Sequence, residues 1–105
     1  MKLDYGMSNL AILSLIGQRI KEYRIRRNLQ QKELARHAGI SQDTVVRLEQ
    51  GFPVSTEKLV RILRSLEMLE NIDLLVPEPP ISPILMKKLQ GKQRMRIRHK
   101  KNEED

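Results

Sequence analysis

Four side chains that form hydrogen bonds lie close together near the middle of the chain: Gln42, Asp43, Thr44 and Arg47. Each of these types matches a group on duplex DNA: Gln pairs with adenine, Arg with guanine, Asp with the cytosine amino group, and Thr with a phosphate or a thymine methyl. The chemistry that this polar set predicts is recognition by hydrogen bonding. It requires an exposed helix that can enter a DNA groove.

The surrounding sequence predicts such a helix as one of a pair. Residues 30–51 read as two short helices joined by a tight turn. Gly39 can adopt the left-handed conformation that ends the first helix, and Ser41 can cap the second. Val45 and Leu48 then form the inward stripe of the second helix. We therefore expect the polar set to face outward and to contact base edges.

A longer ordered set of residues surrounds this pair with regular gaps: Arg24, Gln31, Glu33, Leu34, Ala35, Gly39, Ser41, Val45, Leu48, Glu49 and Gly51. With these residues, the span from about Ile16 to Leu75 resembles the Cro/C1-type (XRE) helix-turn-helix transcriptional regulators. The resemblance implies an all-α, five-helix, lambda-repressor-like DNA-binding domain. Gln30 departs from the family, which often has a better cap there, and Asp43 brings an acidic group to a surface that meets DNA.

The resemblance also implies roles for residues outside the polar set. Gln31 would hold a backbone phosphate, helped by the positive end of its helix. Three more cations are expected beside it on the same phosphate track, with a purely solvated role as the alternative: Lys32, Arg36 and Lys58. Arg24 and Glu49 would form an internal ion pair that ties the first helix to the end of the recognition helix.

Composition narrows the class of partner. Lys and Arg number 20 against 13 Asp and Glu, so the formal charge is +7, which is typical of proteins that bind polyanions. Cysteine is absent, so disulfides and thiolate metal sites are excluded, and we expect a cytoplasmic protein. The apolar residues 10–17 are far fewer than the ~20 that span a membrane, so no membrane association is expected.

Residues that could catalyse a reaction are not arranged for it. His37 and His99 have no metal-binding motif around them, and the sequence contains no phosphate-binding loop or nucleophile motif. We expect no metal, no cofactor and no enzymatic activity. A single Phe and no Trp also argue against recognition of single-stranded RNA, so double-stranded DNA is the expected partner.

Proline residues suggest how the chain is organised. We expect a helix-turn-helix domain over residues 8–76 and a proline-rich linker with a basic tail over residues 77–105. The first helix should be extended, with Ser8 or Asn9 as its N-terminal cap. The segment ILMKKLQ predicts a brief amphipathic turn. The basic tail that follows either stays solvated and flexible or lies on flanking phosphates.

Taken together, the sequence predicts a sequence-specific transcriptional repressor that binds DNA as a homodimer. Two other classes stay open. One is the antitoxin of a toxin–antitoxin pair, which would bind and inhibit a kinase-like toxin and regulate its own operon. The other is a protein adaptor that kept the fold and lost DNA binding.

Overall fold

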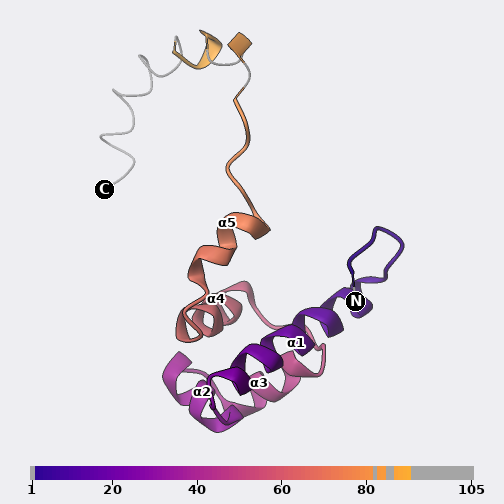
Figure 1. Ribbon diagram of the computed structural model, residues 1–105, viewed down its shortest axis with the longest axis vertical. Helices are drawn as coiled ribbons and strands as arrows, with labels where there is room; N and C mark the ends of the chain where they lie inside the picture. Colours follow the sequence, from indigo (N-terminus) through magenta and orange to yellow (C-terminus); the bar gives the residue numbers. More distant parts are fainter. Residues whose placement is uncertain (1, 82, 85–86, 91–105) are drawn as a thin grey trace. The chain divides into compact units, whose positions relative to one another are not determined.

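The structure is a computed structural model that describes residues 2–81, 83–84 and 87–90 (Figure 1). A first compact unit runs to Leu75, and a second unit begins at Val76. The helices of the first unit follow in this order: α1 (Asn9–Arg26), α2 (Gln31–Ala38), α3 (Gln42–Glu49), α4 (Thr56–Ser65), a 3-10 helix η1 (Leu69–Asn71) and α5 (Ile72–Leu75). The described residues contain helices and no strands, so the predicted all-α class is confirmed.

Serine residues start three of these helices. The hydroxyl oxygens of Ser8, Ser41 and Ser55 each accept a hydrogen bond from the amide three residues later, at 3.1, 3.1 and 3.2 Å. Each bond satisfies one of the free N–H groups of a first helical turn. The predicted extended first helix is therefore confirmed, with Ser8 as its cap.

The start of α2 is capped by a different kind of hydrogen bond. Gln30 stands at the cap, and its own backbone N–H donates to the Glu33 carboxylate at 3.0 Å. This is the reciprocal half of a capping box, in which the side chain of the third helical residue reaches back to the cap. Although Gln30 stands where Ser or Thr is common, the start of α2 therefore still has a capping hydrogen bond.

The core of the first unit is built from the inner faces of α1 to α4. Its most completely buried side chains are Leu34, Val45, Ile62 and Leu66, each with an exposed fraction of 0%. They come from α2, α3, α4 and the residue that ends α4. Burying one such side chain stabilises the fold by about 1.5 to 3 kcal/mol. The core thus fixes α3 between its neighbours.

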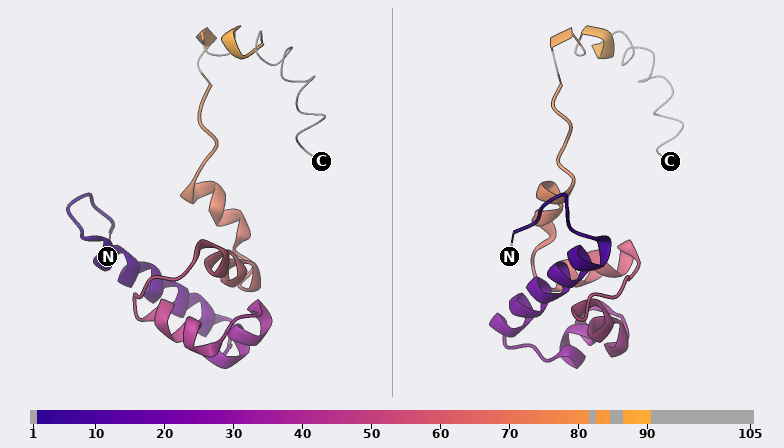
Figure 2. Two further views of the ribbon diagram at one scale, coloured as in Figure 1. Left: turned by 180° about the vertical axis from the view of Figure 1, so that it is seen from behind. Right: turned by 90° about the vertical axis from the view of Figure 1, so that its right-hand side faces the viewer.

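Two glycines let α1 approach the end of α3 closely, and Figure 2 shows the two helices side by side in both views. A Cβ atom on Gly17 would overlap the carbonyl oxygen of Leu48 and lie 2.9 Å from that of Glu49. Gly51, which follows α3, has φ +91°, and a Cβ there would lie 2.5 Å from the Ser14 hydroxyl oxygen. Any larger side chain would push the two helices apart.

The last helix of the first unit is a single turn. It follows η1 directly, ends at Leu75 before Pro77, and leaves Leu74 and Leu75 with exposed fractions of 81% and 64%. In the second unit, residues 83–84 and 87–90 are helical, in line with the brief turn predicted for ILMKKLQ. The basic tail over residues 91–105 lies outside the described residues.

Within the part of the chain that the structure describes, no helix is long and apolar enough to cross a membrane.

Candidate nucleic-acid interface

Helix α3 presents a polar surface to solvent and an apolar surface to the core. Val45 and Leu48 have exposed fractions of 0% and 3% and hold the helix against the domain. Gln42, Asp43 and Arg47 are exposed. Three of the four side chains in the predicted polar set are therefore free to meet a partner along this helix.

For Thr44, the structure corrects the position that the sequence predicts. Its exposed fraction is 8%, so the expectation that it lies on the outward surface is wrong. Thr44 lies four residues before the buried Leu48 and so on the same side of α3. Its hydroxyl lies 2.8 Å from the Ser41 hydroxyl, and the Thr44 amide donates to the same oxygen. Thr44 therefore helps to fix the start of α3.

Arg47 stacks on a side chain that is absent from the predicted site. Its guanidinium carbon lies 5.2 Å from the centroid of the Phe52 ring. Such an arrangement attracts the cation to the negative face of the ring. Among the described residues, we find no ion pair between Arg47 and Asp43 one turn earlier. The only sequence signal for this contact is the single Phe of the chain, just after Gly51.

A buried ion pair anchors the other side of α3. Arg24 Nε lies 2.6 Å from Glu49 Oε2, Arg24 Nη2 donates to Glu49 Oε1 at 3.1 Å, and the two side chains are 10% and 3% exposed. Arg24 Nη1 also donates to the Leu29 carbonyl oxygen at 2.7 Å. The ion pair that the resemblance implies is thus present, and it joins α1 to the end of α3.

Gln31 belongs to the same network. Its amide Nε2 donates to Glu49 Oε1 at 3.0 Å, and its side chain is half-buried. The Glu49 carboxylate therefore accepts hydrogen bonds from both Arg24 and Gln31, which compensates the cost of burying a charge. The contact places the Gln31 amide at the junction of α2 and α3, where its second N–H can serve another acceptor.

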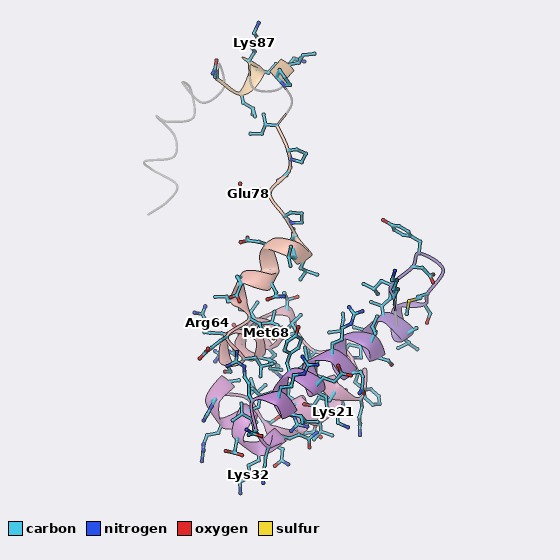
Figure 3. All side chains as sticks on the ribbon, in the orientation of Figure 1. Lys21, Lys32, Arg64, Met68, Glu78 and Lys87 are labelled. Atoms are coloured by element: carbon cyan, nitrogen blue, oxygen red, sulfur yellow. The ribbon has the colours of Figure 1, made fainter. Side chains whose placement is uncertain are left out.

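The three further cations expected on the phosphate track are all exposed: Lys32 and Arg36 on α2, and Lys58 in the first turn of α4. Figure 3 shows Lys32 pointing away from the helices. None of the three is held in the core, so each can move toward a phosphate. Whether they contact DNA stays a prediction.

Groups of acidic, histidine or cysteine side chains that could hold a metal ion are not found in residues 2–81, 83–84 and 87–90. His37 is exposed on α2, and His99 lies outside the described residues. The chemistry available on α3 is therefore that of amide, carboxylate and guanidinium groups, which recognise a partner by hydrogen bonds and charge.

Residues 20–68 match the family model described as Helix-turn-helix, which corresponds to the Cro/C1 (XRE) type. These residues form a Cro/C1-type helix-turn-helix domain. The match begins within α1, covers α2, α3 and α4, and ends just before η1. Members of this family are DNA-binding regulators. The sequence matches no curated protein. In helix-turn-helix domains the second of the two paired helices is the recognition helix, and α3 holds that position after α2.

Proposed function

We propose that this chain is a sequence-specific regulator of transcription that binds double-stranded DNA as a homodimer and acts as a repressor. The observation that carries the proposal is the outward surface of α3, where Gln42, Asp43 and Arg47 are exposed while Val45 and Leu48 are buried. A helix of this kind fits the major groove, whose base edges differ for every base pair.

Each exposed side chain on α3 has a preferred partner in the groove. Arg47 can donate two hydrogen bonds to O6 and N7 of guanine, and Gln42 can pair in the same way with adenine. Asp43 can accept from the cytosine amino group, although its charge disfavours nearby phosphates. Thr44 has no place in this set, because its hydroxyl is committed to the Ser41 cap.

Backbone phosphates would be held from α2 and α4. The half-buried Gln31 already donates one amide N–H to Glu49, and we assign its second N–H to a phosphate. Three exposed cations add charge to the same track: Lys32, Arg36 and Lys58. Contacts of this kind set the position of the domain on the duplex and carry no sequence information.

Dimer formation would compensate for the small size of α3. One helix of eight residues offers few base contacts, and two copies on half-sites about one helical turn apart would double them. The exposed apolar side chains of Leu74 and Leu75 in α5, and of Leu10 at the start of α1, support surfaces on which a second copy could pack.

Selection from a pool of random duplexes tests the proposal directly. We expect enrichment of a partly palindromic sequence, and a gel shift of the selected duplex at a mass of two chains. Arg47→Ala should relax the preference at one position of each half-site, at a cost of about 1 to 3 kcal/mol. Selection that enriches no motif would instead favour an adaptor that does not read DNA.

The antitoxin alternative adds a protein partner to the same DNA-binding surface. It stays a hypothesis, and co-purification from the native host tests it. A kinase-like protein that remains bound in a defined ratio would support this function, and a chain purified alone would favour the autonomous repressor.

A further inference from the structure

We propose that Phe52 is a specificity-determining residue: its ring fixes the direction of the Arg47 guanidinium and thereby sharpens the base preference at the position that Arg47 reads. The inference rests on the proposed function, since Arg47 must meet a base for its direction to matter. Phe52 lies outside α3 and is not itself assigned to a base.

The backbone after α3 holds the ring in place. Gly51 has φ +91°, a conformation that suits glycine and reverses the chain. The reversal lets the Gly51 amide donate to the Leu48 carbonyl oxygen at 3.0 Å and the Phe52 amide donate to the Arg47 carbonyl oxygen at 2.9 Å. Phe52 is thus tied by its own backbone to the residue on which its ring stacks.

Stacking leaves the guanidinium able to read a base. An aromatic ring has no strong acceptor, so Arg47 keeps its N–H donors, which point outward in the plane of the group. Arg24 shows the contrast, because each of its three guanidinium nitrogens already donates a hydrogen bond to Glu49 or to a backbone carbonyl oxygen. A cation held by a ring face is oriented but still free to donate two hydrogen bonds to guanine.

Restricting the Arg47 side chain before DNA binds also affects discrimination between bases. A long flexible side chain loses freedom when it binds, and it can shift to accommodate a different base. A guanidinium that is already held in one direction loses less freedom when it binds the matching base, and it adapts less well to other bases. The ring should therefore act mainly on the ratio between bases.

Core packing does not account for the position of this ring. The exposed fraction of Phe52 is 48%, and it is outside the buried cluster of the domain. A second pair of the same kind provides a matched control: Arg26 lies over the ring of Tyr23 at 6.0 Å on α1, and Tyr23 is 41% exposed. The two rings differ in whether their arginine belongs to α3.

The test compares Phe52→Leu, Phe52→Tyr and the control Tyr23→Leu in the full chain. Binding is measured by competition between the selected duplex and duplexes changed only at the position whose preference Arg47→Ala removes. We expect Phe52→Leu to lower the ratio between the best base and the others by about two- to fivefold. Phe52→Tyr keeps the aromatic face and should keep the ratio, as should Tyr23→Leu.

A double mutant separates direction from general loss of binding. In the Arg47→Ala background, Phe52→Leu should cause no further change at that position, because the ring then has no guanidinium to orient. Thermal melting of each variant checks the fold, and Phe52→Met replaces Phe52→Leu if the latter folds poorly.

Three results would overturn the inference. One is an unchanged ratio in a folded Phe52→Leu or Phe52→Met variant. Another is equal weakening at all bases, which would indicate a general contact. The third is a parent chain that prefers no sequence at all, and that result would also reject the proposed function, whereas the first two leave it standing.

Discussion

Glu49→Ala should destabilise the domain strongly. The substitution removes both oxygens that accept hydrogen bonds from Arg24, and with them the bond from the Gln31 amide. The Arg24 side chain is only 10% exposed, so its charge would stay in the interior with the Leu29 carbonyl oxygen as its remaining partner in the described network. A buried cation without its counter-ion is costly.

The size of the effect follows from this geometry. Breaking a buried ion pair by removing one partner costs about 3 to 5 kcal/mol. In a domain of 60 to 100 residues each kcal/mol lowers the melting temperature by roughly 4 to 8 °C, so a decrease of about 12 °C or more is expected. Ala at Gln42 or Asp43, which are exposed, should change stability by only about 0.5 kcal/mol.

Circular dichroism with thermal and urea melts measures the difference. A double variant, Arg24→Met with Glu49→Leu, is the informative companion, because it removes both charges and keeps apolar volume in their place. We expect it to recover much of the lost stability. If Glu49→Ala melted at the same temperature as the parent, the buried pair would have no structural role.

Three further predictions test other parts of the domain. Gly17→Ala should cost about 1 to 3 kcal/mol in urea melts, because the added Cβ would overlap the Leu48 carbonyl oxygen; parent-like stability would show that α1 can move away freely. Thr44→Val should leave the selected DNA sequence unchanged and cost about 0.5 to 1.5 kcal/mol, and an altered sequence would restore Thr44 to the base-contacting set. Deletion of residues 91–105 should weaken binding to all duplexes and flatten the dependence of affinity on salt, whereas an unchanged slope would show that the tail stays off the phosphates.

Features that depend on residues close together in the chain could be predicted from the sequence. The caps at Ser8, Ser41 and Ser55 each involve an amide only three residues away, and Gly39 has the left-handed φ of +69° that its position after Ala38 indicated. Local geometry decides such contacts, so the residue types are enough. The ion pair of Arg24 and Glu49 spans two helices and was accessible only through the family resemblance.

The errors and omissions arise where tertiary geometry or a neighbouring side chain decides the outcome. Thr44 lies one turn before the buried Leu48, so it shares the inward side of α3, and its hydroxyl meets that of Ser41 at the cap. The role of Gly17 depends on how close α1 comes to α3, which no local pattern reveals. Phe52 lies beside Arg47 only because the chain reverses at Gly51.

These contacts together explain how so short a helix can serve the recognition that we propose for it. An isolated helix of eight residues would be largely unfolded in water, since helices below about 12 residues are marginal on their own. In this domain the start of α3 is fixed by the Ser41 cap, and its end by the Glu49 network and by the close approach of Gly17. Because both ends are held before DNA arrives, little ordering remains to oppose binding. Stability of the domain and recognition by α3 should therefore decline together when either anchor is removed.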